Sequence, residues 1–260
     1  MGPIRRALPG REEVGNVRTR ILAVFCLVLA FSAVCHAQGT IPLIGDKAPA
    51  FKAMTTQGEI DFPDQYKGKW VILFSHPGDF TPVCTTEFMM FASMYPKFQA
   101  ANCELLGLSV DSNPSHIAWL REIADKIEYK GLKNVQVQFP IIADNMGQIA
   151  QLFGMLQPSA SATKTVRAVF FIDPTGIVRA LIYYPLSNGR NIDEIYRILI
   201  AMQTSDAEKV ATPANWQPGD DVIVPAPGTM AGVGKRLDGS DASGGKCVDW
   251  FLCFKKLTPQ

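Results

Sequence analysis

The sequence predicts an α/β fold with a mixed central sheet over roughly residues 42–204. Short apolar runs rich in β-branched and aromatic residues alternate with longer amphipathic stretches, as is typical of layered α/β domains. The last two apolar runs flank Asp173-Pro174-Thr175-Gly176, a strong turn sequence that predicts an antiparallel hairpin. With 260 residues, 47% of them hydrophobic, the chain is long enough to bury one sizeable core.

The expected elements follow in chain order. Residues 45–60 are expected to form a loop and then a short extended piece, and Lys69–Ser75 a buried strand. A helix is expected from Thr81, a good N-cap followed by Pro82, with Pro96 kinking or interrupting it. The remaining predictions are strands at 104–111 and 137–144, helices at 114–127, 146–155 and 191–210, and two strands within 166–184.

The first 37 residues have the pattern of an export signal. Five arginines precede an uncharged apolar run at residues 21–34, and Ala37 ends a plausible small-residue cleavage site. The run is shorter than the roughly 20 residues that a membrane-spanning helix needs. We therefore expect a cleaved signal peptide at 1–37, which includes Cys26 and Cys35, and a periplasmic or secreted protein. The alternatives are an uncleaved anchor or an organelle transit peptide.

Residues 205–260 are expected to form a C-terminal extension. From Ala211 onward the chain is rich in proline and glycine, and it ends in the aromatic stretch CVDWFLCFKK. This segment is too short and loop-rich for a core of its own, so we expect it to pack on another surface. The formal net charge of the whole chain is +1, which gives no indication of a nucleic-acid partner.

Cys84 stands in the first turn of the expected helix after residue 81. Free backbone N–H groups and the positive end of the helix dipole favour a thiolate there. Thr81 offers a hydroxyl one turn away, Pro77 shields the loop from water, and Arg167 adds a positive charge if its strand lies beside the first. The alternative is that Cys84 is a small buried hydrophobic residue.

The loop before the helix carries a resemblance to a known family. Pro77-x-x-x-Thr81-x-x-Cys84 resembles the active-site motif of peroxiredoxins, and SHPGDFTPVCTTE is similar to the form in the one-cysteine-type branch. VRAVFFIDP, NGRNIDEI and VATPANWQPGD resemble the same branch, over about residues 44–224. The resemblance implies a thioredoxin-like fold with helices on both faces of the sheet. It also implies reduction of hydrogen peroxide and organic hydroperoxides, an antioxidant role, and no cofactor such as a metal, haem or flavin.

The resemblance also implies roles for individual residues. Cys84 would be the peroxidatic cysteine, whose thiolate attacks the peroxide and becomes a sulfenic acid. Thr81 and Arg167 would bind the peroxide, Arg167 would also favour the thiolate, and Pro77 would limit access of water. His76 would support peroxide binding. Glu87 and Arg190 would orient Arg167 or close the pocket, unless they are solvated charges on a helix and a loop.

A second pair of cysteines lies near the C-terminus. CVDWFLC resembles the C-terminal pair of archaeal members of the branch, which implies that Cys253 of a neighbouring subunit attacks oxidised Cys84. Cys247 would then form a disulfide with Cys253 for reduction by an external thiol such as thioredoxin. The alternatives are that Cys247 attacks first, that the pair is a structural disulfide, or that it forms half of a zinc site. Branch members are usually homodimers, some in decamers of five dimers, and are mostly cytoplasmic.

Other residues and functions carry less weight. Cys103, just before a strand, is expected to be a structural thiol, and His116 a surface or packing residue. A general disulfide oxidoreductase usually has Cys-x-x-Cys at the helix start, but position 87 is Glu. A holdase-type chaperone oligomer stays open. The phospholipase activity ascribed to some relatives is not expected, since Lys69 and Pro63 occupy the positions of its serine and histidine.

Overall fold

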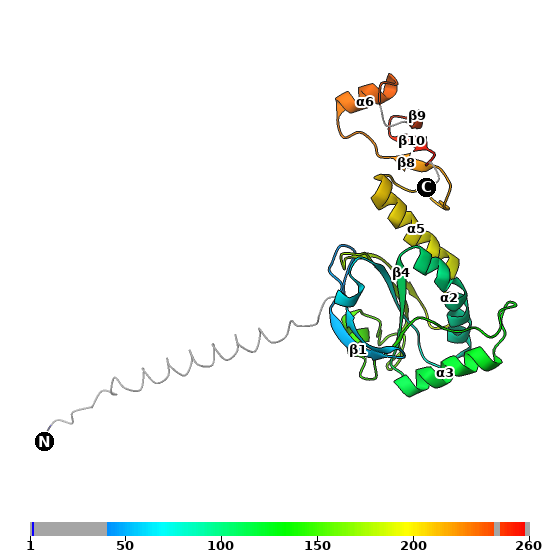
Figure 1. The fold of residues 1–260 in the computed structure, drawn as a ribbon. Helices are drawn as coiled ribbons and strands as arrows, with labels where there is room; N and C mark the ends of the chain where they lie inside the picture. The colour runs from blue at the N-terminus through cyan, green and yellow to red at the C-terminus, as the bar shows by residue number, and fades with distance from the viewer. Residues whose placement is uncertain (1, 3–40, 242–244, 258–260) are drawn as a thin grey trace. The chain divides into compact units, whose positions relative to one another are not determined.

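The structure is a computed structural model that describes residues 2, 41–241 and 245–257 (Figure 1). The chain divides into two compact units, Met1–Ile41 and Pro42–Gln260, and every element below belongs to the second. The predicted signal peptide therefore falls outside the described residues except for Gly2. Within the described residues, no helix has the length and apolarity that a membrane span requires.

The centre of the second unit is a seven-stranded sheet in the order β2-β1-β5-β4-β3-β6-β7. β3, β4 and β5 run parallel to one another, whereas the other neighbouring pairs are antiparallel. The predicted mixed sheet is thus confirmed. Its strands are β1 Phe51–Thr55, β2 Gly58–Phe62, β3 Trp70–Ser75, β4 Cys103–Ser109, β5 Ile141–Ala143, β6 Arg167–Ile172 and β7 Val178–Tyr184.

Helices cover both faces of this sheet. Side chains of α2 (Pro82–Ala100), α3 (Asn113–Lys126) and α5 (Ile192–Glu208) belong to one core cluster. The short helix α4 (Gln148–Leu152) contributes to the cluster on the other face. Figure 1 shows α2 and α5 side by side, and the rings of Phe98 and Tyr196 meet between them at 5.4 Å. This layered arrangement agrees with the thioredoxin-like fold that the sequence implies.

The alternation of side chains along the central strands separates the two cores. In β3, Trp70, Ile72 and Phe74 face the α2 side, whereas Val71 and Leu73 face the opposite side. All six residues of β3 are buried, because helices or loops cover both faces. The strand therefore reads as a continuous apolar run, and this is why the sequence predicts it well.

Two local expectations need correction. Residues 51–62 form a full hairpin rather than a loop and a short extended piece, with Gly58 at φ +107° in its turn. Pro96 does not interrupt α2, which continues to Ala100. The helix tolerates this proline near its C-terminal end, where large apolar residues such as Phe91 and Phe98 still anchor it to the core.

The C-terminal extension has more regular structure than its composition suggests. It contains a short strand β8 (Val222–Val224), a helix α6 (Met230–Leu237) and a hairpin of β9 (Lys246–Asp249) and β10 (Leu252–Lys255). These strands form a small antiparallel sheet in the order β8-β10-β9. As expected, the segment has no large core of its own: Trp216 and Val222 pack with Ala201 of α5. Sequence patterns missed the sheet because strands of three or four residues give almost no periodicity.

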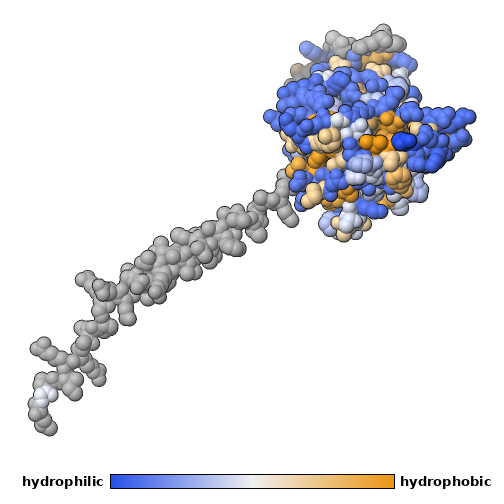
Figure 2. All heavy atoms as spheres, turned by 60° about the horizontal axis from the view of Figure 1, so that its bottom comes forward, coloured by the Kyte–Doolittle hydropathy of each residue, from blue (hydrophilic) through white to orange (hydrophobic). Residues whose placement is uncertain are grey.

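Figure 2 shows one face of the molecule, on which apolar residues form separate patches among hydrophilic ones. Several large apolar side chains are exposed in the described part of the chain, among them Phe80, Met146, Met230, Val248 and Phe251. Single exposed apolar residues are normal on protein surfaces. An exposed apolar residue indicates a binding surface only when others of its kind, or a reactive group, lie beside it.

Candidate active site

The loop between β3 and α2 is fixed along its whole length. The backbone N–H of His76 donates to Leu108 O at 2.9 Å, and that of Asp79 donates to Asp111 Oδ2 at 3.0 Å. Pro77 is buried, and Phe80 adopts a left-handed backbone with φ +54°. A bulky residue holds that conformation only when its surroundings determine it. The loop therefore delivers Thr81 and the start of α2 in one defined geometry.

Cys84 is the third residue of α2 and is completely buried. Its place in the first turn is the one predicted, where backbone N–H groups lack helical acceptors. The buried face of α2 runs Cys84, Phe88, Phe91, Tyr95 and Phe98, so it begins at Cys84. Burial alone would favour the neutral thiol. A thiolate here therefore needs a specific positive partner.

Arg167 is that partner, with its Nη1 atom 3.3 Å from Cys84 Sγ. The expectation that its strand lies beside the first is confirmed, because β6 pairs with β3. Arg167 precedes Val169 and Phe171 by even steps, so it faces the α2 side of the sheet as they do. Its Nε and Nη2 atoms donate to Leu186 O at 3.1 and 2.7 Å, which leaves Nη1 directed at the sulfur.

A buried ion cluster supports this contact. Glu87 Oε2 accepts from Arg167 Nη1 and from Arg190 Nη2, both at 2.7 Å. Glu87 Oε1 accepts from the Nε and backbone N–H of Arg190 at 2.9 and 2.8 Å. Glu87 is 2% and Arg190 7% exposed, so neither is a solvated surface charge. This geometry matches the predicted orientation of Arg167.

The cluster holds two arginines and one glutamate, so its charges do not cancel. Burial raises the pKa of Glu87, but the charges of Arg190 and Arg167 outweigh it and hold the pKa below its ordinary value. Glu87 is therefore anionic, and the two arginines stay protonated. One positive charge remains next to Cys84 Sγ. A thiolate at Cys84 would balance this charge.

Thr81 occupies the predicted N-cap position, but its hydroxyl makes no capping bond to the helix. The hydroxyl donates instead to Gly78 O at 2.8 Å. The single hydroxyl proton of Thr81 is thus used in the hydrogen bond to Gly78 O. The hydroxyl oxygen keeps lone pairs that can accept a hydrogen bond. An acceptor at this position suits a ligand that carries an O–H group.

A buried chain of hydrogen bonds lies behind the loop. Asp79 Oδ1 lies 3.1 Å from His76 Nε2, and Asp79 Oδ2 lies 2.9 Å from His116 Nδ1. His116 is fully buried on α3, so its expected place at the surface is wrong and packing is the correct alternative. His76 and Asp79 both lie in the motif around Cys84, but the sequence did not indicate this chain, because His116 lies 37 residues beyond Asp79 in a separate helix.

Burial favours the neutral form of His76, although the hydrogen bond to Asp79 acts in the opposite direction. Burial raises the pKa of Asp79, but hydrogen bonds from His116 and His76 outweigh it, so its pKa lies below the ordinary value. Burial lowers the pKa of His76. A neutral His76 that donates from Nε2 to the Asp79 carboxylate has a bare Nδ1. That Nδ1 atom is buried and has no hydrogen-bond partner among the described residues.

The other cysteines are in different environments. Cys103 is a buried free thiol, and burial, with Glu104 nearby, raises its pKa well above the ordinary value. It is therefore unreactive, as expected of a structural thiol. Cys247 and Cys253 form a disulfide that joins β9 to β10. This is the pairing that the resemblance to archaeal relatives implies.

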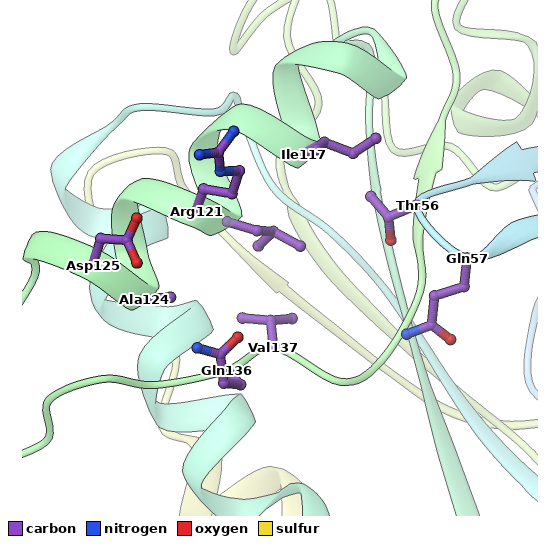
Figure 3. A pocket seen from close by; sticks show the side chains of 9 residues that line it. Thr56, Gln57, Ile117, Arg121, Ala124, Asp125, Gln136 and Val137 are labelled. Carbon is purple, nitrogen blue, oxygen red and sulfur yellow. The ribbon is translucent and has the colours of Figure 1, made fainter.

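A separate hollow of about 470 Å³ lies away from these residues. Figure 3 shows Ile117, Arg121 and Asp125 of α3 facing Thr56 and Gln57 of the β1–β2 turn. No cysteine and no predicted site residue lines it. Cys84 of α2 and Arg167 of β6 therefore do not line this hollow.

Comparison with known proteins identifies the family. Residues 44–181 match the AhpC/TSA family, and residues 201–239 match the C-terminal domain of 1-Cys peroxiredoxin. A peroxiredoxin of Methanosarcina mazei is 61% identical over 218 residues, which cover 84% of this chain and 99% of that protein. The chain belongs to the peroxiredoxin family. It is therefore an enzyme of the thiol-dependent peroxidase class, as the motif around Cys84 predicts.

Solved structures of peroxiredoxins agree with this assignment. A yeast mitochondrial 1-Cys peroxiredoxin superposes with a TM-score of 0.70 at 38% identity, covering 84% of this chain and all of the yeast chain. A cysteine-to-serine mutant of peroxiredoxin 6 from Arenicola marina gives a TM-score of 0.69 at 34% identity, covering 84% of this peroxiredoxin and 99% of that chain. The thioredoxin-like fold and the one-cysteine-type branch predicted from the sequence are thereby confirmed.

Proposed function

We propose that this peroxiredoxin reduces hydrogen peroxide and organic hydroperoxides through Cys84, as an antioxidant enzyme. The observation that carries the proposal is the contact of 3.3 Å between Arg167 Nη1 and Cys84 Sγ inside a buried cluster with an uncompensated positive charge. Such a site stabilises a thiolate, and the thiolate is the nucleophilic form of cysteine. The second free thiol of the described chain, Cys103, has no cation among its contacts.

The proposed reaction is a displacement on oxygen. The Cys84 thiolate attacks the terminal oxygen of the peroxide, an S–O bond forms and the O–O bond breaks. The departing oxygen takes up a proton and leaves as water or an alcohol, and Cys84 becomes a sulfenic acid. Arg167 stabilises the negative charge that moves from sulfur to the departing oxygen. No cofactor takes part in this proposal.

Thr81 and His76 are proposed to position the peroxide. The Thr81 oxygen can accept a hydrogen bond because its own proton goes to Gly78 O. The bare Nδ1 of neutral His76 provides a second buried acceptor. Hydroperoxides carry an O–H group, whereas dialkyl peroxides do not, so this arrangement favours hydroperoxides. Pro77 keeps bulk water from the same loop.

The first test is to trap the sulfenic acid. The reduced double variant Cys247→Ser/Cys253→Ser, which has no tail thiol to consume the sulfenic acid, is treated with one equivalent of hydrogen peroxide in the presence of dimedone, and the modified peptide is located by mass spectrometry. We expect one adduct per chain, at Cys84, because Cys103 is buried with a raised pKa. An adduct at Cys103 in place of Cys84, or consumption of peroxide without any adduct or disulfide, would contradict the proposal.

We propose that the tail pair resolves the sulfenic acid. Cys253 of a neighbouring subunit attacks oxidised Cys84, and Cys247 then displaces Cys84 to form the Cys247–Cys253 disulfide. The disulfide between β9 and β10 supports this as the end state of the relay. The external reductant is a thiol protein such as thioredoxin; the yeast relative is described as resolved through glutathione and thioredoxin systems.

Non-reducing gels test the relay. After one equivalent of peroxide, we expect Cys247→Ser to accumulate a covalent dimer joined through Cys84 and Cys253, and Cys253→Ser to form none. If Cys253→Ser instead forms a covalent dimer joined through Cys84 and Cys247, and Cys247→Ser forms none, then Cys247 attacks first. If both variants turn over peroxide at the wild-type rate with a small dithiol and no dimer forms, the tail disulfide is structural.

A homodimer is the smallest assembly that this relay allows. Beyond Val178, which bonds to Gly45 and Asp46, the edge strand β7 has no strand partner on its outer side among the described residues, and unpaired edges readily accept a second strand. We also propose export to the periplasm or the cell exterior, from the pattern of residues 1–37. Cell fractionation with N-terminal sequencing tests this: a mature protein that begins near Gln38 is expected, and an intact N-terminus in the cytoplasm would contradict it.

A further inference from the structure

The two sulfurs of the tail disulfide differ in exposure. Cys253 is completely buried, whereas every residue of β9, including Cys247, is exposed. Val224 of β8 pairs with Cys253 from one side. The backbone of Gly245 covers it from another, since a Cβ there would lie 3.2 Å from Cys253 Cβ and 3.1 Å from Val224 Cγ2. Gly245 thus permits a close approach that shields Cys253.

This difference decides which sulfur an external thiolate can reach. Thiol–disulfide exchange requires the nucleophile to touch one sulfur while the other leaves as a thiolate. Cys253 Sγ offers no open surface, so attack in the folded hairpin is directed to Cys247 Sγ. Cys253 is then the leaving group.

The surroundings of Cys247 are unusually apolar for an exposed hairpin. Val248 is 77%, Phe251 53% and Trp250 36% exposed, and all three lie within four residues of Cys247. The rings of Trp250 and Phe251 meet edge to face at 5.6 Å. We call Val248, Trp250 and Phe251 the hairpin patch. Exposed aromatic residues of this kind are typical anchors of protein–protein contacts.

We propose that Cys247 Sγ is the point of attack for an external dithiol protein and that the hairpin patch is its docking surface. This inference rests on the proposed relay and specifies its last step. A protein reductant fits better than a small thiol, since a small thiol needs no apolar surface beside the sulfur. The neighbouring subunit is the other candidate occupant of the hairpin patch. In the proposed relay, however, Cys253 is the residue that reacts with that subunit, whereas the hairpin patch lies beside Cys247.

The step balances as a two-electron exchange. A thiolate of the reductant attacks Cys247 Sγ, an intermolecular S–S bond forms, and the Cys247–Cys253 bond breaks to release the Cys253 thiolate, which takes up a proton. The second thiol of the reductant, as its thiolate, then attacks the reductant's first sulfur, which is bonded to Cys247 Sγ in the mixed disulfide. The bond to Cys247 breaks, and Cys247 is released as a thiolate that takes up a proton. The tail pair ends as two thiols, and the reductant ends as a disulfide.

The first experiment maps the attacked sulfur. The full chain with Cys84→Ser is oxidised with diamide to set the tail disulfide, so that the result does not depend on peroxide chemistry. A thioredoxin whose second active-site cysteine is replaced by serine is then added, and the trapped mixed disulfide is digested and sequenced by mass spectrometry. We expect thioredoxin on Cys247 in nearly all of the product. Equal labelling of both cysteines, or labelling of Cys253, would overturn the assignment.

The second experiment tests the docking surface. We expect Phe251→Glu to lower kcat/KM for thioredoxin about tenfold in steady-state peroxide reduction, while turnover with dithiothreitol stays unchanged. Met230→Glu is the matched control, since Met230 is 85% exposed on α6 of the same extension and should leave both rates unchanged. Equal losses in Phe251→Glu with both reductants, or a loss in Met230→Glu equal to that in Phe251→Glu, would overturn the docking role.

A single-turnover measurement separates this inference from the proposed function. Reduced wild type and Phe251→Glu are each mixed with one equivalent of peroxide without any reductant. Equal rates of formation of the tail disulfide support docking of the reductant, whereas a slower rate in Phe251→Glu assigns the patch to the neighbouring subunit. Failure of wild type to consume the peroxide would contradict the proposed function, and the diamide-based mapping of Cys247 would remain valid.

Discussion

Cys84→Ser is expected to reduce peroxide turnover to the uncatalysed background, a loss on the order of 10⁶-fold, the scale at which removal of a covalent nucleophile acts. A serine hydroxyl at this position stays protonated, because one arginine cannot stabilise an alkoxide that is far more basic than a thiolate. The measurement is hydrogen peroxide consumption with dithiothreitol as reductant. The fold should survive, since the substitution changes one atom in a pocket already lined by polar groups.

Cys103→Ala is the matched control for this loss. Cys103 is also a buried free thiol, but it lies at the start of β4. We expect its removal to cost about 1 kcal/mol of stability at most, on the scale of small changes in a core, and to leave peroxide turnover unchanged. Full activity in Cys84→Ser, or loss of activity in a folded Cys103→Ala, would contradict the assignment of the peroxidatic cysteine.

Glu87→Gln is expected to lower the free energy of unfolding by about 3–5 kcal/mol at neutral pH. The substitution keeps the shape of the side chain but leaves Arg167 and Arg190 buried without their shared anion, and breaking a buried pair in this way has a cost of that size. Activity should fall as well, because Arg167 loses the partner that helps to direct it at Cys84 Sγ. Denaturation by urea gives the stability, and peroxide consumption gives the rate.

The pH dependence of this effect has a definite sign. The pKa of Glu87 in the folded state lies below its ordinary value of 4.5, so the unfolded chain binds the proton more readily. The stabilisation by Glu87 is thus complete above about pH 4.5 and is lost as the pH falls through the folded-state value. We expect the stability difference between wild type and Glu87→Gln to shrink as the pH falls below 4.5.

Glu122→Gln provides a matched control for Glu87. Glu122 also pairs with a basic residue, Lys126, but on the exposed surface of α3. Exposed pairs of this spacing contribute about 0.3–0.5 kcal/mol, so the expected loss is close to the error of the measurement. A loss in Glu122→Gln as large as that in Glu87→Gln would mean that burial is not the cause.

Much of the site was predictable because it follows from local rules. The position of Cys84 in the first turn of α2 follows from the N-cap and proline signals at Thr81 and Pro82. The pairing of β6 with β3, which brings Arg167 to the sulfur, joins strands far apart in the sequence, so the local signals left it as a condition that only the structure meets. The burial of Glu87 and Arg190 was left open, since a charged residue is usually solvated and local sequence carries no information about a distant partner.

Other features depend on tertiary contacts that no local pattern encodes. His116 meets Asp79 only because α3 packs beside the β3–α2 loop, and the spacing of 37 residues between them is not periodic in any element. The small sheet of the extension is held by pairing between β8 and β10, which are separated by a long stretch of loop and α6. Its strands are too short to be recognised before their partners are known.

The buried charges around Cys84 also bear on how the enzyme is inactivated. In the proposed mechanism, the thiolate balances the excess positive charge of the two arginines, but the sulfenic acid is neutral and leaves it uncompensated. A second peroxide converts the sulfenic acid to a sulfinic acid, which is anionic and restores the balance. Cys84 is fully buried, so the first turn of α2 must open before a tail cysteine can reach it. In the proposed mechanism, the electrostatics that create the nucleophile therefore also favour the sulfinic acid over the sulfenic acid.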